Sequence, residues 1–239
     1  MDSQEQFPSD FAQAAPGARQ SFEAHSLSVG QRLLVLALNA LPLLHVLGVV
    51  AVVVCPWAAV AWRVVAALGV LYLLPAALAG MIVRRFPFRS TVVQPGSPEF
   101  FKWWALFSLQ VLFCRLPALE EAMRIIPSLY SAWLRLWGSR IGRLVYWAPG
   151  TRILDRSFLV IGDDVVFGAG VRLNPHVMAR NDGGQTDLLL APVKIGPRTL
   201  VGGYSLLTAG TEIPADETTR ACLLSPPFTK WRDGKRVKE

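Results

Sequence analysis

The sequence has 239 residues, of which 52% are hydrophobic and 17% are charged. The first fraction is high and the second is low for a soluble protein, so this composition excludes a wholly water-soluble chain. The net charge is +7, but the chain has neither a nucleic-acid-binding motif nor a dense basic helix. We therefore expect a membrane protein with a soluble C-terminal part, the lipid bilayer as a partner and no nucleic-acid partner.

The cysteines indicate neither a disulfide framework nor a metal centre. Their number is odd, and no CxxC or Cys/His spacing is present, so we expect no metal cofactor and a reducing compartment. The three cysteines are Cys55, Cys114 and Cys222.

Residues 1–30 are polar and of mixed composition, which predicts a flexible N-terminal tail. A signal peptide is not expected here. Such peptides begin with a short basic region, whereas the first apolar run of this chain starts only after residue 30.

Residues 31–84 predict a transmembrane helical hairpin. The apolar run from residue 33 exceeds the roughly 20 residues that span a bilayer, so we expect a turn between Cys55 and Arg63. The basic residues that follow mark the cytoplasmic side under the positive-inside rule. In a bacterial-type inner membrane, the N-terminus and the C-terminal domain then both lie on the cytoplasmic side. These basic residues are Arg84, Arg85 and Arg89.

His45 lies within the first predicted span. It is either a functional intramembrane group or a neutral histidine bonded to a neighbouring helix or lying near a headgroup. The second interpretation is the favoured one.

Residues 85–140 mix aromatic, apolar and basic side chains, which suits the membrane interface. We expect an interfacial linker of amphipathic helices on the cytoplasmic leaflet, interrupted at Pro117 and Pro127. A short third transmembrane helix over residues 103–116 is the alternative.

Residues 141–225 repeat with a period of six, as in IGDDVV-FGAGVR-LNPHVM over residues 161–178. Large apolar residues occupy the first place of each hexapeptide, and Val or a small residue occupies the fifth. A period of six fits neither an α-helix nor an isolated strand, and it is typical of a parallel β-helix with these two places pointing inward. The pattern predicts about four coils, interrupted by a loop over residues 179–194.

The predicted solenoid is short, so its ends must be covered or its sides joined. We expect either homo-oligomerisation or packing against the preceding helices. The pattern weakens after Thr218, and Pro226 and Pro227 predict its end. Residues 226–239 are then a basic tail. This tail is either solvated or in contact with the phosphates of coenzyme A or with anionic lipid. The basic residues that would make such contacts are Lys230, Arg232, Lys235 and Arg236.

His176 is the one histidine of the predicted soluble part. It occupies the fourth place of LNPHVM, which should face outward, and it stands directly before the loop. An imidazole with a pKa near neutrality suits a general base. The alternative is an ordinary surface histidine bonded to a backbone carbonyl, and the residues alone favour that alternative.

Residues 141–222 resemble the left-handed β-helix, or hexapeptide-repeat, acyltransferases. The resemblance rests on the coil ending in NPHVM, the loop after it, and PVKIG at residues 192–196. With the preceding helices and the WLRLWGSRIG entry at residues 133–142, the layout also resembles the membrane-linked C-terminal β-helix regions of polylysine-synthetase-like peptide synthetases. The last coil departs from the family, because Pro214 stands in place of a glycine.

The resemblance implies a left-handed solenoid, a homotrimer and an acyltransferase. It implies transfer of an acyl group, most simply acetyl, from acyl-CoA or another thioester to a hydroxyl or amine. His176 would be the catalytic base, acyl-CoA would be a co-substrate, and no resident cofactor would be bound.

Further candidate residues surround this reaction. Asn174 is expected to position the acceptor, or to be a corner residue. Asn181 and Asp182 bind the substrate or orient the imidazole, or simply form a turn. A third group consists of Gly202, Gly203 and Tyr204. We expect the pantetheine arm of the donor to pass these residues; alternatively, they are ordinary corner residues of the coil.

Other uses of such a solenoid are open. A non-catalytic scaffold or oligomerisation module on a membrane anchor is the main alternative. A carbonic-anhydrase site needs three histidine ligands, and the predicted soluble part has only one histidine. The acceptor cannot be read from the sequence, but the location beside a membrane suggests a lipid-linked or membrane-emerging molecule.

Overall fold

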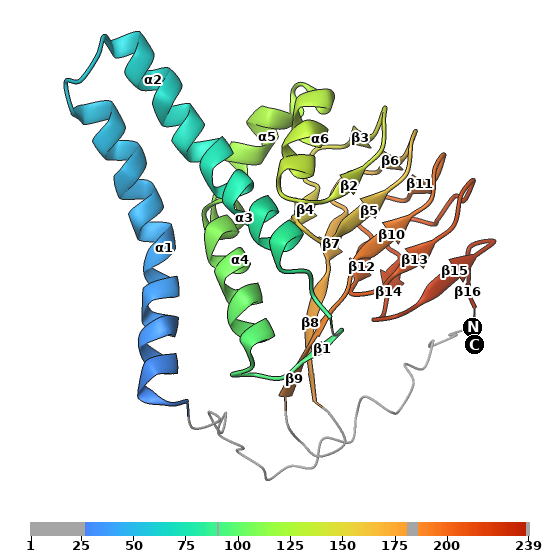
Figure 1. The fold of residues 1–239 in the computed structure, drawn as a ribbon. Coiled ribbons are helices and arrows are strands. Elements are labelled where there is room, and N and C mark those ends of the chain that lie inside the picture. The colour runs from blue at the N-terminus through green and yellow to red at the C-terminus, as the bar shows by residue number, and fades with distance from the viewer. Residues whose placement is uncertain (1–26, 90, 181–185, 238–239) are drawn as a thin grey trace, which may run out of the picture.

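The computed structural model describes residues 27–89, 91–180 and 186–237. Figure 1 shows a helical hairpin, a central group of helices and a solenoid of short strands arranged side by side. Most of the predicted N-terminal tail, together with Asn181 and Asp182, lies outside the described residues.

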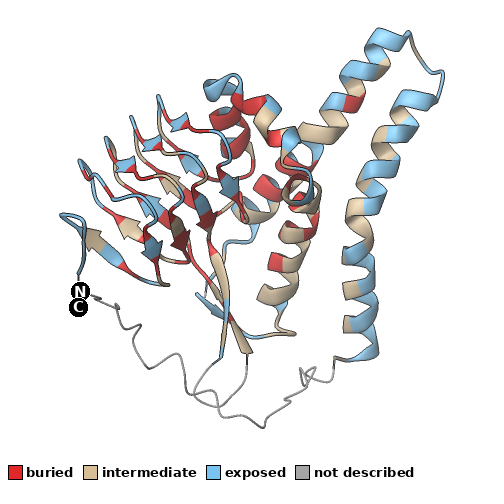
Figure 2. Ribbon diagram, turned by 180° about the vertical axis from the view of Figure 1, so that it is seen from behind, coloured by how far each residue is buried: buried red, intermediate tan, exposed pale blue. Residues whose placement is uncertain are grey.

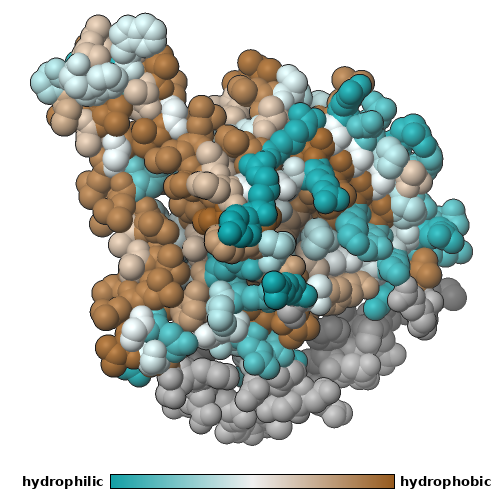
Figure 3. Space-filling model, in the orientation of Figure 1, coloured by the Kyte–Doolittle hydropathy of each residue, from teal (hydrophilic) through white to brown (hydrophobic). Residues whose placement is uncertain are grey.

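The hairpin consists of α1 (Val29–Val54), α2 (Val60–Leu68), the π-helical turn η2 (Gly69–Leu73) and α3 (Leu74–Arg85). Ser28 caps α1, because its hydroxyl accepts the backbone N–H of Gln31 at 3.3 Å. Two helical stretches of the described residues, 29–54 and 60–85, are long and apolar enough to cross a membrane. No residue of α1 is buried, and Figure 3 shows the hairpin as a mostly hydrophobic surface beside a more polar solenoid.

Helix α4 (Pro98–Arg115) lies between the hairpin and the solenoid. On one side, Trp104 Nε1 donates to Asn39 Oδ1 of α1 at 2.9 Å. On the other side, Trp103 is buried and bonds to Asp155 of the solenoid. Helix α4 thus contacts protein on two sides, and its position on the cytoplasmic leaflet stays a prediction. Its apolar side chains face protein on two sides, so it lacks the single apolar face of a surface helix.

Helices α5 (Ala118–Arg124) and α6 (Pro127–Leu136) cover the first coil of the solenoid. Helix α3 packs closely on the end of α6 through Gly80. A Cβ atom at Gly80 would lie 2.0 Å from the carbonyl oxygen of Leu136, so only glycine permits this contact. The hairpin, the central helices and the solenoid thus share one continuous core, and Figure 2 shows buried residues in both the central helices and the coils.

The solenoid has three faces, and its strands stack in parallel from coil to coil. The parallel β-helix predicted from the hexapeptides is confirmed. One face, which we call face 1, contains β2 (Arg140–Ile141), β5 (Leu159–Ile161), β10 (Val193–Ile195), β13 (Glu212–Ile213), β15 (Lys230–Arg232) and β16 (Lys235–Val237). Face 2 contains β3 (Tyr146–Trp147), β6 (Val166–Phe167) and β11 (Leu200–Val201). Face 3 contains β4 (Arg152–Ile153), β7 (Arg172–Asn174), β12 (Leu206–Thr208) and β14 (Leu224–Ser225).

First-place and fifth-place side chains fill the interior, as the repeat predicts. Ile161, Phe167 and Leu173 are buried, and so are Val165 and Val171. Trp147 stacks on Phe167 with ring centroids 4.6 Å apart. Burial of these apolar columns is the main stabilising contribution within the solenoid.

The interruption after the second coil is a β-hairpin and not the predicted loop. Strands β8 (His176–Arg180) and β9 (Thr186–Leu190) pair antiparallel, and β9 also pairs with β1 (Val92–Val93). The alternation of buried Leu188 and Leu190 with partly buried neighbours explains why this segment forms a strand. Figure 1 shows this hairpin extending away from the coils.

The coils continue beyond residue 225, so the predicted end of the solenoid at Pro226 and Pro227 is wrong. Strand β15 pairs with β13, and β16 folds back on β15. Pro226 follows β14, which is the edge strand of face 3. No described strand lies beyond β14 to accept a hydrogen bond from the amide that proline lacks. The four basic residues assigned to the tail lie on strands: Lys230 and Arg232 on β15, Lys235 and Arg236 on β16.

Candidate active site

One corner of the solenoid departs from the regular turn. The fourth place of a hexapeptide normally adopts positive φ, which closes the corner in a left-handed conformation. Positive φ is found at Leu144, Gly150, Asp164, Gly170, Arg198, Tyr204, Gly210, Asp216, Cys222 and Phe228. The two fourth-place residues without it are Arg156 and His176. They follow β4 and β7, so the first two coils are irregular at the same corner of the solenoid.

His176 and Asp155 form a hydrogen-bonded pair at this corner. Nδ1 of His176 contacts Oδ2 of Asp155, whose side chain is 1% exposed. The His176 side chain is 15% exposed. It points out of the coil, as the fourth place predicts, but α4 covers it, with the Trp103 and Phe107 rings 5.0 and 5.7 Å from the imidazole. Its partner is thus a buried carboxylate and not the backbone carbonyl of an ordinary surface histidine.

Helix α4 holds the Asp155 carboxylate in place. Trp103 Nε1 donates to Oδ1 at 3.0 Å, and Gln110 Nε2 donates to the same oxygen at 3.5 Å. The other carboxylate oxygen is left for Nδ1–H of His176. This arrangement selects the tautomer in which Nε2 carries a lone pair, and no described residue bonds to Nε2. A histidine oriented in this way can accept a proton from a bound molecule.

The pKa of His176 is raised above its ordinary value. Burial is the largest influence and lowers the pKa, but the hydrogen bond and the negative charge of Asp155 together outweigh it. His176 is therefore a stronger base than a free imidazole, and Asp155 stabilises the imidazolium that proton transfer creates.

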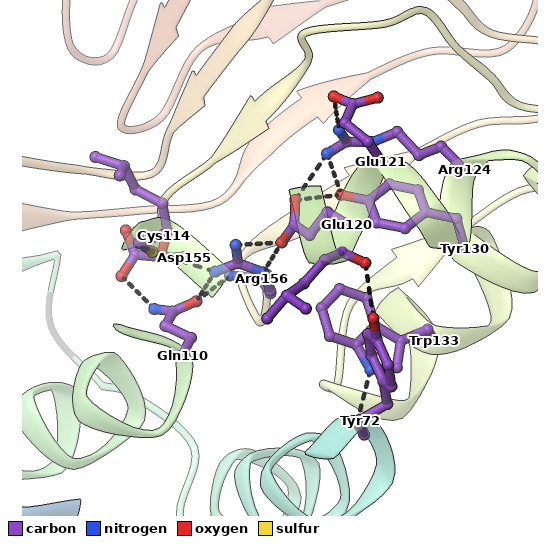
Figure 4. A network of polar contacts seen from close by, with 12 residues as sticks. Tyr72, Gln110, Cys114, Glu120, Glu121, Arg124, Tyr130, Trp133, Asp155 and Arg156 are labelled. Atoms are coloured by element: carbon purple, nitrogen blue, oxygen red, sulfur yellow. Dashed lines mark hydrogen bonds and ion pairs between the residues drawn. The ribbon is translucent and has the colours of Figure 1, made fainter. Parts of the chain in front are cut away.

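A buried network of charged and polar side chains is connected to Asp155 through Gln110 (Figure 4). Arg156 forms an ion pair with Glu120 of α5 and donates to Gln110 Oε1 at 2.9 Å. Glu120 also accepts from Arg124 at 2.7 Å and from the Tyr130 hydroxyl at 3.1 Å. Gln110 links this network to Asp155, so α4, α5, α6 and the first coil are joined by polar contacts.

Tyr130 keeps its proton in this network. Burial first, and the charge of Glu120 second, raise the pKa of Tyr130 well above its ordinary value. Its hydroxyl therefore remains a donor to Glu120 across the physiological pH range.

The structure does not gather all the predicted site residues at one place. Asn174 lies on β7, two positions before His176, and its register partner is Thr208 of β12. Gly202, Gly203 and Tyr204 follow β11 and precede β12, so they occupy the corner at the opposite end of face 3 from His176. Tyr204 is 72% exposed there. Asn181 and Asp182 lie outside the described residues.

A groove of about 620 Å³ lies on face 1, away from this corner. It is lined in part by Lys194, Glu212 and Trp231. The described residues contain no group of three or more His, Cys, Asp or Glu side chains that could hold a metal ion.

Sequence reasoning missed Asp155, Trp103 and Gln110. One signal was present: ILDRSF places adjacent charges, Asp155 and Arg156, in the coil before the one that contains LNPHVM. Nothing in the sequence indicates that α4 brings Trp103 and Gln110 to these residues, because the contacts span 52 and 45 positions of the chain.

Comparisons with known proteins return only distant structures. No family model and no curated protein matches the chain. A hexapeptide-repeat-containing acetyltransferase from Vibrio cholerae is 15% identical, with 54% of this chain and 90% of that chain covered and a TM-score of 0.38. A maltose O-acetyltransferase from Clostridium difficile 630 is 17% identical, with coverage of 50% and 82% and a TM-score of 0.32. A galactoside acetyltransferase in complex with coenzyme A is 12% identical, with coverage of 52% and 78% and a TM-score of 0.34.

These neighbours are acetyltransferases, and similarity at this level decides nothing about the activity of this chain. The site itself defines the class: a parallel β-helix that carries a buried aspartate and histidine pair under a covering helix. The function proposed below rests on that geometry.

Replacing Asp155 with asparagine is expected to shift the pH dependence of activity. A histidine base works when neutral, so activity rises as pH increases through its pKa, which Asp155 holds above the ordinary value. Without the carboxylate, the midpoint of this rise should move to lower pH, and the rate should fall at every pH because the tautomer is no longer fixed. A profile of kcat/KM from pH 5 to 9 checks both effects. An unchanged midpoint would contradict the pairing.

Replacing Trp103 with phenylalanine removes a hydrogen bond and keeps an aromatic ring. The loss of a donor to the buried Asp155 carboxylate should destabilise the protein by about 1–3 kcal/mol. With one donor fewer, the carboxylate should attract the His176 proton more strongly and move the activity midpoint to higher pH. Chemical denaturation and the same pH profile measure the two effects. Trp104→Phe is the matched control, because Trp104 bonds to Asn39 instead, and equal midpoints for both variants would refute the role of Trp103.

Proposed function

We propose that this chain is a membrane-anchored acyltransferase that moves an acyl group, most simply acetyl, from acyl-CoA to a hydroxyl or amine. The observation that carries the proposal is the Asp155–His176 pair, in which Nε2 has no described protein partner. Raised basicity at a partly covered corner is what a general base for this reaction needs.

The proposed reaction uses Nε2 of His176 as the base. Nε2 of His176 takes the proton of the acceptor hydroxyl or amine, and the acceptor oxygen or nitrogen attacks the thioester carbonyl carbon. The C–S bond then breaks, and the departing sulfur takes the proton back from the imidazolium. Asp155 keeps the ring oriented and stabilises its positive charge between the two transfers.

The acceptor is proposed to be linked to the membrane. His176 faces α4, and α4 contacts α1 through Trp104 and Asn39. The base therefore lies on the side of the solenoid that faces the apolar hairpin. The hairpin would span the bilayer, with Arg84 and Arg85 at the end of α3 marking the cytoplasmic side. A homotrimer is proposed from the family resemblance alone.

A donor panel tests the proposal. Purified protein in lipid nanodiscs is incubated with acetyl-, butyryl- and palmitoyl-CoA and an extract of lipid-linked acceptors, and free thiol is followed. We expect thiol release that depends on the extract and is fastest with acetyl-CoA. If a folded protein releases thiol from no donor in the presence of the extract, a non-catalytic scaffold replaces the acyltransferase.

A further inference from the structure

We infer that Arg152 and Arg172 form a phosphate-binding subsite on the outer surface of face 3. Strands β4 and β7 pair in parallel, and their register places Arg152 directly beside Arg172. Both arginines are exposed, while the next residues, Ile153 and Leu173, point into the core. Neighbouring strands lie about 4.8 Å apart, so the two guanidinium groups project from adjacent positions on one surface.

No described residue balances the charges in this column. Like charges on directly opposed residues destabilise a sheet. Two other exposed basic residues of the coils have acidic partners: Lys194 pairs with Glu212 and Arg198 pairs with Asp216, both at 2.6 Å. Arg152 and Arg172 form no ion pair with any described residue.

The column continues from the arginines to Leu206 and Leu224, so the next two strands add no carboxylate. The planar forks of two adjacent arginines match the oxygen atoms of a phosphate group. An anionic ligand would therefore relieve their repulsion and satisfy their donors.

The subsite lies on the same face of the solenoid as the proposed catalytic corner, toward the other end of that face. Arg172 precedes His176 by four residues, which corresponds to at most about 13 Å of extended chain. Arg152 stands between Gly150, whose amide is bound by Glu121 of α5, and Leu154, whose carbonyl is contacted by Cys114 of α4. Arg152 thus lies near the place where the helices meet the solenoid, and the distance to His176 suits a substrate that reacts at one end and carries phosphate at the other.

The identity of the phosphate rests on the proposed function, and two sources share this chemistry. One is the nucleotide part of an acyl-CoA donor, and the other is the phosphate of a lipid acceptor. Equilibrium binding separates them without any turnover. Binding of CoA and of pantetheine, and binding of dihexanoyl phosphatidate, are measured on the full chain by calorimetry, for the wild type and Arg152→Gln/Arg172→Gln.

We expect the double variant to lose at least about tenfold in affinity for CoA or for phosphatidate, with pantetheine binding unchanged. A loss confined to CoA assigns the donor, and a loss confined to phosphatidate assigns the acceptor. The matched control is Arg143→Gln/Arg220→Gln, which removes two exposed charges elsewhere on the solenoid. The subsite is refuted if both ligands bind the double variant as tightly as the wild type, or if the control variant loses as much. Because these measurements need no turnover, a failed acyltransferase proposal would leave this result intact.

Discussion

Replacing His176 with alanine is expected to lower the rate of acyl transfer by about 10²- to 10⁴-fold, the usual contribution of a positioned general base. The expectation follows from the pairing with Asp155, which fixes the ring and leaves Nε2 available. The fold should be retained, because the imidazole lies outside the apolar columns of the coils. Single-turnover measurement of acyl-CoA consumption gives the rate directly.

Two comparison variants make this result specific. His176→Gln keeps a polar side chain of similar length but cannot act as a base, so it should be as slow as His176→Ala. His45→Ala removes the other described histidine, whose Nε2 contacts the carbonyl oxygen of Val70 in the hairpin, and it should keep the wild-type rate. If His176→Gln retained most of the activity, His176 would be a structural residue.

Replacing Glu120 with glutamine is expected to destabilise the protein by about 3–5 kcal/mol. Glu120 is the one carboxylate that forms an ion pair with Arg156 among the described residues, and the Arg156 side chain is 1% exposed. The neutral amide would leave a buried guanidinium without a counter-charge, although Gln110 would still accept one of its hydrogen bonds. Urea denaturation monitored by tryptophan fluorescence measures the change.

A second substitution distinguishes a lost ion pair from simple damage to packing. In Glu120→Gln/Arg156→Met the unpaired charge is gone, and part of the stability should return. Asp216→Asn breaks the exposed pair with Arg198 and should change stability little. If the double variant were less stable than Glu120→Gln, the charge imbalance would not be the cause of the destabilisation.

The solenoid could be predicted because its cause is local and periodic. Each large first-place residue, such as Phe167 or Leu173, faces the core for the same geometric reason, so the period alone reveals the architecture. The extension past residue 225 was missed because Pro226 normally ends a ladder. Beside an edge strand, the missing amide of Pro226 removes no hydrogen bond between strands. Whether β14 is the edge strand depends on how many coils follow it.

The site could be predicted only in part. His176 was visible as an outward residue at a broken repeat, but its partner Asp155 lies in the coil before it. Their meeting depends on the irregular corner at Arg156 and His176, where the backbone does not adopt the left-handed turn. Trp103 and Gln110 come from α4, whose composition suggested the membrane surface. Its position between the hairpin and the solenoid depends on contacts across the whole chain, which no local pattern encodes.

His176 is proposed to act as the general base in acyl transfer to a membrane-linked acceptor. The most direct measurement incubates membranes containing the protein with acetyl-CoA labelled in the acetyl group and follows the label into the organic extract. We expect labelled lipid with the wild type and a loss of about 10²-fold or more with His176→Gln. Equal labelling by both proteins, or label that stays in the aqueous phase, would contradict it.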